Sequence, residues 1–188
     1  TNLSALEFED LVTISDVITV IQRCERVLKI QKEIEKYISE LGDEGRLIKM
    51  QLDELVTNVE EEAVLLIKDY LSAEKDTNAE KLLDEFTDWT SEEMLSMNTI
   101  SKALGHGGSV NDLDQSISPR GYRILRKIPR LPMPVIENLV NHYRALKDVI
   151  NATTDELDEV DGIGEVRAQA VKDGLRRLRD QVLLDRHI

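Results

Sequence analysis

Apolar residues recur every three or four positions through the first half of the chain, which is the spacing of one face of an α-helix. Two long stripes carry this pattern, and Gly42 and Gly45 separate them. The first stripe comprises Val17, Val20, Cys24, Val27, Ile34, Ile38 and Leu41, and the second comprises Ile48, Leu52, Leu55, Val59, Ala63, Leu66 and Tyr70. Shorter helical patterns follow over residues 77–89 and 91–103. The sequence therefore predicts an elongated helical bundle or spine, whose stripes either form its core alone or leave an apolar edge for an oligomer contact.

Net charge at first argues against a nucleic-acid partner. The 188 residues carry a formal charge of −13, with 41% hydrophobic and only 4% aromatic residues, a composition that favours helices over a β-barrel. The charge is unevenly spread, however. Residues 1–110 hold 11 Lys and Arg against 24 Asp and Glu, whereas residues 111–188 hold 13 of each. We therefore expect two domains, 1–110 and 111–188, with different electrostatic roles.

The second domain contains a compact motif between Leu157 and Val171. It is expected to form a short helix, a Gly162-Ile163-Gly164 turn and a second helix. The glycines permit positive φ and close approach of the backbone to an external group, while Ile163 anchors the turn in the core. Amides at the start of the second helix form an anion site suited to phosphate. Lysine and arginine side chains on that helix add charge: Arg167, Lys172 and Arg176. This pattern predicts sequence-independent, salt-sensitive DNA binding.

A second copy of the motif lies 32 residues upstream. The apolar residues of this upstream copy match those of the Leu157–Val171 motif at the same spacing, but Arg130 and Pro132 replace the two glycines. Since proline has no amide hydrogen, this turn offers fewer donors to phosphate. We expect residues 125–140, the first hairpin, to be a structural partner of residues 157–171, the second hairpin. Arg126 and Arg130 are further candidates for contact with the DNA backbone.

The frame of apolar residues around Gly-Ile-Gly resembles the helix-hairpin-helix family at every defining position. Two further segments, Leu6–Val12 and the proline-rich Ser118–Val140, are similar to the DisA family of DNA-integrity-scanning diadenylate cyclases. This resemblance covers essentially the whole chain. It implies an all-α fold, with a helical linker followed by a tandem helix-hairpin-helix domain like domain 2 of RuvA.

Membership of the DisA family would also imply a cytoplasmic bacterial octamer, associated with the nucleoid, that makes cyclic di-AMP from ATP with a divalent metal. Branched DNA would inhibit that synthesis and link the protein to DNA damage and repair. The Asp-Gly-Ala and Arg-His-Arg motifs of the cyclase do not occur in these residues, and Arg186-His187-Ile188 is not a match. We therefore expect a linker and DNA-binding region that starts where the cyclase domain would end, as a fragment or a processed product. We expect neither cyclase activity nor a site for ATP, another cofactor or a metal.

Other functions remain as alternatives. A base-excision glycosylase would place a catalytic aspartate beyond the hairpin, and Asp185 is the candidate, although only 24 residues follow Gly164. A helical oligomerisation scaffold would use its hairpins for protein contacts instead of DNA.

His106, His142 and His187 are isolated from other metal-ligating residues and receive no catalytic role. Neither a signal pattern nor an apolar run of membrane-spanning length is present, so no membrane partner is expected.

Overall fold

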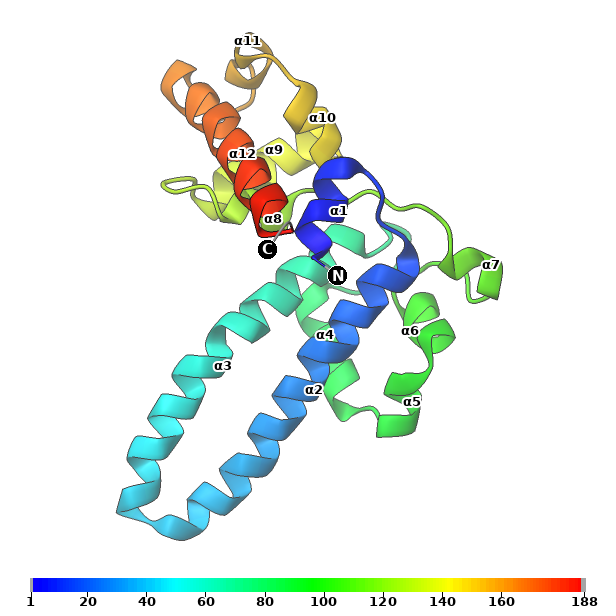
Figure 1. The fold of residues 1–188 in the computed structure, drawn as a ribbon, viewed down its shortest axis with the longest axis vertical. Helices are drawn as coiled ribbons and strands as arrows, with labels where there is room; N and C mark the ends of the chain where they lie inside the picture. Colours follow the sequence, from blue (N-terminus) through cyan, green and yellow to red (C-terminus); the bar gives the residue numbers. More distant parts are fainter. Residues whose placement is uncertain (1, 187–188) are drawn as a thin grey trace. The chain divides into compact units, whose positions relative to one another are not determined.

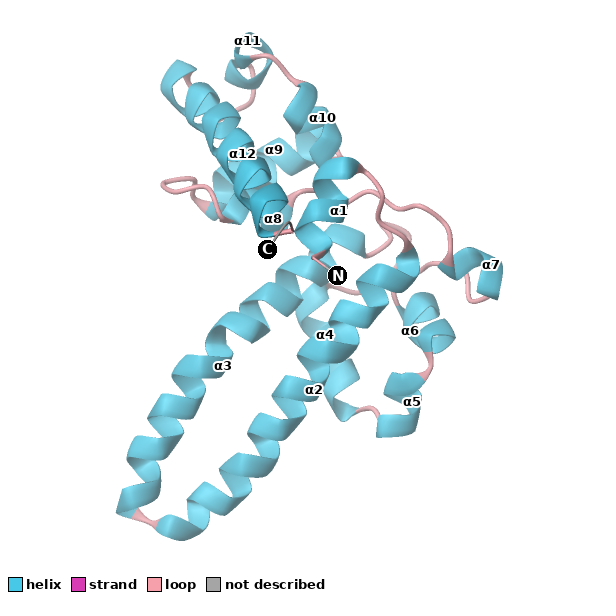
Figure 2. Cartoon of the chain, viewed as in Figure 1, coloured by secondary structure: helices cyan, strands magenta, loops and turns pink. Residues whose placement is uncertain are grey.

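The computed structural model describes residues 2–186, and His187 lies outside this range. Within it, every regular element is a helix, and one isolated antiparallel bridge joins Thr13 to Ser116 (Figure 2). The prediction of an all-α fold is confirmed. None of the described helices combines the length and the apolar character that crossing a bilayer requires.

The described chain divides into two compact units. The helical unit is the continuous segment Ser15–Asp114, and the hairpin unit combines the residues up to Ile14 with those from Gln115 onwards. This division differs from the expected boundary near residue 110, because the first residues of the chain group with the last. The difference has a physical cause in a buried ion pair, described below.

The helical unit is built on a hairpin of two long antiparallel helices, α2 and α3 (Figure 1). Gly42 ends the short 3₁₀ turn between them with φ +64°, and Gln31 Nε2 lies 3.3 Å from Asp53 Oδ1 across the pair. The remaining helices are short. The elements are α2 (Ile14–Ile38), η1 (Ser39–Leu41), α3 (Asp43–Tyr70), α4 (Ala79–Asp88), α5 (Ser91–Leu95), α6 (Met97–Ala103) and α7 (Val110–Leu113).

The core of the helical unit forms where the short helices meet one half of this hairpin. Phe86 is fully buried and meets Trp89 edge to face at 4.9 Å between ring centroids. Gln22 and Lys29 of α2 donate to the carbonyl oxygens of Met94 and Trp89, at 2.9 and 2.6 Å. The other large, fully buried side chains of this core are Ile18, Ile21, Leu66, Ile67, Leu82, Ile100 and Leu104.

The other half of the α2–α3 hairpin has no such cover. The predicted stripes therefore do not stay buried along their length. Val27, Ile34 and Leu41 of the first stripe, and Ile48 and Leu55 of the second, are exposed. Cys24 is only partly buried. The expectation that the stripes form core alone is wrong for this half, because α4, α5 and α6 are too short to pack against it.

Residues 104–119 begin with a glycine-rich stretch that is typical of a loose linker, yet they are held at several points. His106 Nε2 lies 2.6 Å from the carbonyl oxygen of Tyr70, and this histidine is half-buried. Ser109 and Asp112 form a capping box that starts α7. The Ser109 hydroxyl and amide hold the pKa of the Asp112 carboxyl below its usual value. These local bonds were not evident from the glycine-rich composition of the segment.

The hairpin unit consists of six helices among the described residues, in two pieces of chain. Backbone hydrogen bonds from Ile14 to Gln115 and from Ile117 to Val12 join the pieces. The elements are α1 (Leu3–Glu9), α8 (Tyr122–Arg126), α9 (Met133–Tyr143), α10 (Leu146–Asn151), α11 (Thr154–Asp158) and α12 (Glu165–Asp185). Asp185, the glycosylase candidate, is exposed at the end of α12.

A buried ion pair fixes α1 to the hairpin unit. Arg123 Nη2 of α8 lies 3.0 Å from Glu7 Oε1 and 2.9 Å from Ser4 Oγ, and all three residues are buried. An isolated charge is costly in such surroundings, so each partner needs the other to stay in place. Near the surface, Arg186 Nη1 of the last turn lies 2.7 Å from Glu9 Oε2. The start of the chain is thus part of the hairpin unit.

Candidate nucleic-acid interface

The two hairpins repeat each other closely in backbone structure. The helices α8 and α9 begin at Tyr122 and Met133, and α11 and α12 begin 32 residues later, at Thr154 and Glu165. The connecting turns agree as well, since Leu131 and Ile163 are both buried. The 32-residue repeat proposed from sequence is therefore present in the described structure as two helix–turn–helix units.

The turn conformations explain which glycine the motif needs. Gly162 has φ +82°, and Arg130 occupies the same place in the first hairpin with φ +61°. Gly164, in contrast, is extended at φ −99°, like Pro132 at φ −71°. Only Gly162 uses the positive φ that both glycines permit, because only the first position of the turn is left-handed. Arg130 adopts this conformation despite its Cβ, which disfavours it by about 1 kcal/mol.

The start of α12 is open to an external acceptor. Gly164 is its N-cap and supplies no side-chain hydrogen bond, so no side chain caps the first amides of this 21-residue helix. The helix α9 also begins without a side-chain cap, at Pro132, but Pro134 in its first turn removes one amide donor. In α11, by comparison, Thr153 and Glu156 form a capping box, and Thr154 is the first helical residue. Both hairpin turns thus lead into a helix without a side-chain cap, a feature that α8 and α10 share.

Basic side chains from both hairpins meet in one open hollow of about 470 Å³. We call it the basic hollow. Three predicted site residues line it, Arg126 and Arg130 from the first hairpin and Arg167 from the second. Lys127 is a fourth cation, and the other lining residues, Ile128, Pro129, Leu131 and Pro132, are uncharged. Arg167 Nη1 also donates to the carbonyl oxygen of Gly162 at 2.8 Å, which holds it beside the turn.

Two other predicted contacts lie elsewhere. Lys172 Nζ donates to the carbonyl oxygens of Ile150 and Ala152, at 2.8 and 2.6 Å. These carbonyls belong to the end of α10 and the residue just after it, so the ammonium group ties this end to α12. Arg176 Nη2 lies 3.2 Å from Asp173 Oδ1. Lys172 and Arg176 line a separate hollow of about 330 Å³ that does not include the turn residues.

Replacing Lys172 by methionine should therefore change the stability of the protein more than its affinity for DNA. We expect Lys172→Met to lower the free energy of unfolding by about 1.5 kcal/mol, since charged hydrogen bonds to two carbonyls are lost while the apolar stem is kept. Urea denaturation followed by circular dichroism measures the effect. Lys147→Met is the control, because Lys147 is half-exposed and its nearest partner, Asp10, lies 3.6 Å away. If Lys172 contacted DNA instead, Lys172→Met would lower the affinity for DNA and leave stability unchanged.

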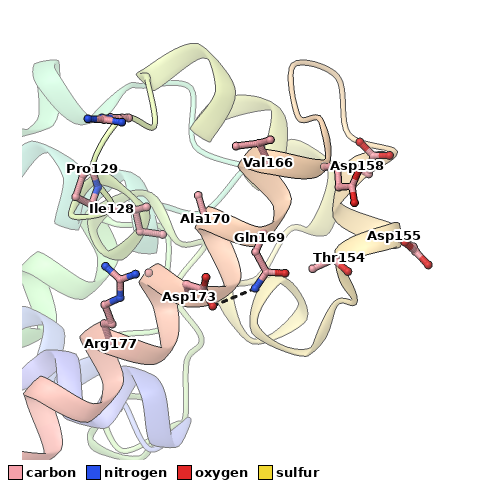
Figure 3. A pocket seen from close by; sticks show the side chains of 13 residues that line it. Ile128, Pro129, Thr154, Asp155, Asp158, Val166, Gln169, Ala170, Asp173 and Arg177 are labelled. Atoms are coloured by element: carbon pink, nitrogen blue, oxygen red, sulfur yellow. Dashed lines mark hydrogen bonds between the residues drawn. The ribbon is translucent and has the colours of Figure 1, made fainter.

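A larger hollow of the hairpin unit has the opposite charge and shares Ile128, Pro129 and Arg130 with the basic hollow (Figure 3). It has a volume of about 1010 Å³, and Gln169 donates to Asp173 within it at 3.1 Å. Four carboxylates line it against two arginines, Arg130 and Arg177. The carboxylates come from α11 and α12: Asp155, Asp158, Glu165 and Asp173. Such a surface repels phosphate, so the basic hollow is the better candidate interface.

The structure also identifies a residue that sequence reasoning missed. Asn138 of α9 donates from Nδ2 to the carbonyl oxygen of Asp161, at 2.9 Å, and so steadies the turn of the second hairpin from the first. The two residues are 23 positions apart, and no local pattern signals their contact.

At the end of α9, partial burial and the nearby Glu156 and Glu159 raise the pKa of Tyr143, which therefore stays neutral near pH 7. Among the described residues, no group of three or more His, Cys, Asp or Glu could hold a metal ion.

This pair of turns, each with an uncapped helix start, defines a helix-hairpin-helix protein. The helix-hairpin-helix motif model matches residues 145–174, and the model described as the DisA bacterial checkpoint controller linker region matches residues 1–113. Because the linker model covers more than half of the residues, the chain belongs to the DisA family. Both matches agree with the resemblance inferred from the sequence.

Curated relatives show the same relationship. The chain is 54% identical over 179 residues to the DNA integrity scanning protein DisA of Carboxydothermus hydrogenoformans, covering 95% of this chain and 51% of that protein. It is 53% identical over 186 residues to the protein of the same name from Bacillus subtilis, covering 99% and 51%. The Clostridium tetani protein of that name is 52% identical over 187 residues. The chain spans about half the length of the curated relatives it matches.

Proposed function

We propose that this chain binds DNA without sequence preference, through its two hairpin turns. The observation that carries this proposal is the basic hollow beside the uncapped start of α12. Arginine side chains and helix amides both bind phosphate oxygens, and neither reads a base in this arrangement. Gly162, Ile163 and Gly164 shape the second turn, while Arg126, Arg130 and Arg167 supply charge. Lys172 and Arg176 then act on the hairpin unit away from the contact.

A preference for branched DNA is the finer part of this proposal. Two hairpins side by side offer two places for a backbone, and a junction presents several strands at close range. Fluorescence anisotropy with a four-way junction and a linear duplex of equal length tests this preference across a salt series. Tighter binding of the junction at every salt concentration is expected. Equal affinity for the two DNAs would contradict the preference for branched DNA but not the binding of the DNA backbone.

Removing the three arginines of the basic hollow should change the salt dependence of binding. For the triple variant Arg126→Gln, Arg130→Gln and Arg167→Gln, the slope of log affinity against log salt is expected to fall by about three, roughly one for each lost phosphate contact. Anisotropy titrations at several salt concentrations measure it. The control is Arg177→Gln with Arg179→Gln and Arg186→Gln, which removes equal charge from the same helical region outside the basic hollow. An equal loss of slope in both variants would contradict this interface.

We further propose that DNA engagement regulates synthesis of cyclic di-AMP in a DisA-like protein, and that the 188 residues here do not perform that synthesis. In support, the cyclase motifs do not occur among them. Incubation of the chain with ATP and Mg²⁺ or Mn²⁺, followed by chromatography, is expected to yield no cyclic di-AMP. DNA binding would place the protein with the nucleoid in the bacterial cytoplasm.

A second proposal is that the protein is a homo-oligomer. The specific observation in its favour is the apolar surface left uncovered on the α2–α3 hairpin, where nine large hydrophobic side chains between Val27 and Leu55 are exposed. Contiguous apolar surface of this kind is typical of a protein–protein contact. This role is compatible with DNA binding, because the two surfaces belong to different units.

A further inference from the structure

Five exposed apolar side chains form a regular row on α2 and η1. Val27, Ile30, Ile34, Tyr37 and Leu41 follow one another at intervals of three, four, three and four residues. Their exposed fractions lie between 38% and 72%. We call this row the outer stripe. The spacing averages 3.5 residues, which is the repeat of a helix that pairs with another helix over a long seam, and the row extends for about 21 Å.

The outer stripe is distinct from the face that α2 uses within the helical unit. Ile21 and Leu28 of that face are buried, and Gln31 reaches Asp53 on α3. One helix thus carries two apolar faces, and the described structure covers only one of them. Single exposed hydrophobic residues are ordinary at a protein surface, but a continuous row of five is not.

Charge changes sign along the same segment. Residues 23–32 contain three exposed cations, Arg23, Arg26 and Lys32, whereas Lys29 is paired with the buried Glu25 and with the carbonyl oxygen of Trp89. Residues 33–44 contain one cation, Lys36, against five acids, Glu33, Glu35, Glu40, Asp43 and Glu44. The segment is therefore positive at one end of the outer stripe and negative at the other. It is complementary to a copy of itself that runs in the opposite direction.

We propose that the outer stripe is the contact between two copies of this chain, with α2 of one copy antiparallel to α2 of the other about a twofold axis near Ile34. The proposal rests on the homo-oligomer proposed above and names its surface. A twofold contact uses the same patch on both copies, as this charge pattern requires. In this arrangement the positive end of each stripe meets the negative end of its partner. A parallel pair would place like charges together at both ends.

Sedimentation velocity over a concentration series tests the contact. The parent chain is expected to associate, and Ile30→Glu with Tyr37→Glu should raise the dimer dissociation constant at least about tenfold, because four charges would enter an apolar seam. Val110→Glu on α7 is the matched control, since Val110 is exposed, apolar and outside the α2–α3 hairpin. A parent chain that stays monomeric at every concentration overturns the proposal. Association that the stripe variant leaves unchanged overturns this surface but not the oligomer.

Charge reversal tests the antiparallel direction. Arg26→Glu alone and Glu40→Arg alone should each weaken association, whereas the double variant should restore it, because each new charge meets the other in the partner copy. Cross-linking provides a second readout. In a Cys24→Ser background, Ile34→Cys should form a disulfide-linked dimer on oxidation, while Val110→Cys should not. Failure of the double variant to recover, or no cross-link at residue 34, overturns the antiparallel contact; DNA affinity, measured in parallel, reports separately on the hairpin unit.

Discussion

Gly164→Leu is expected to lower DNA affinity at least about tenfold, through the loss of phosphate contacts at the start of α12. A Cβ at Gly164 would have no atom within 4 Å, and the extended backbone there suits any residue. The side chain can therefore be accommodated by the protein itself, but it would stand where the DNA backbone approaches the helix amides. Fluorescence anisotropy with duplex and junction DNA measures the change.

Stability provides the check on this result. Leucine is a poorer N-cap than glycine, so Gly164→Leu should cost up to about 1 kcal/mol and lower the Tm by only a few degrees. Asn141→Leu is the control, because Asn141 is exposed on α9 in the same unit. Gly162 is a less clean test, since its φ of +82° strains any side chain. If Gly164→Leu bound DNA as tightly as the parent, the second hairpin would not be the contact.

Arg123→Leu is expected to destabilise the hairpin unit by about 3 kcal/mol. The change removes the arginine from a buried ion pair, and breaking such a pair by removing one partner is far more costly than losing a surface pair. Urea denaturation followed by circular dichroism should show part of the helical signal lost at lower urea. Trp89, the single tryptophan, lies in the helical unit, and its fluorescence should keep the parent midpoint.

Two variants sharpen the test of the buried pair. Arg186→Leu is the matched control in the same unit, because Arg186 and its partner Glu9 are 49% and 33% exposed and should contribute less than about 1 kcal/mol. Glu7→Leu combined with Arg123→Leu should recover much of the lost stability, since no buried charge then remains. Equal effects of Arg123→Leu and Arg186→Leu would show that burial of the first pair does not matter.

The sequence predicted those parts of the fold that local patterns and the spacing of residues determine. Gly162, Ile163 and the apolar frame around them identified the second hairpin, and the 32-residue offset identified the first. The helix periodicity predicted α2 and α3 but not which of their faces is covered. Which face of α2 and α3 is buried depends on the length of α4 to α6 and on where these helices pack. The residues of α2 do not determine either of these.

The site residues show the same limit. Arg126, Arg130 and Arg167 line one hollow, as charge and spacing suggested. Lys172 looked equivalent to them in sequence, yet its ammonium group meets two backbone carbonyls of the α10 end. Partners of this kind are set by tertiary packing. The grouping of α1 with the hairpins was missed for the same reason, because Glu7 and Arg123 are 116 positions apart.

The two-piece construction of the hairpin unit has a consequence for folding. The helical unit is a continuous segment, so its contacts can form as soon as residues 15–114 are present. The hairpin unit needs residues on both sides of that segment, and closing an unstructured loop of that length costs conformational entropy. The two pieces meet directly, because the Ile14 amide donates to the carbonyl oxygen of Gln115 at 3.2 Å. We therefore expect the hairpin unit, whose contacts join residues far apart in the sequence, to complete its core after the helical unit.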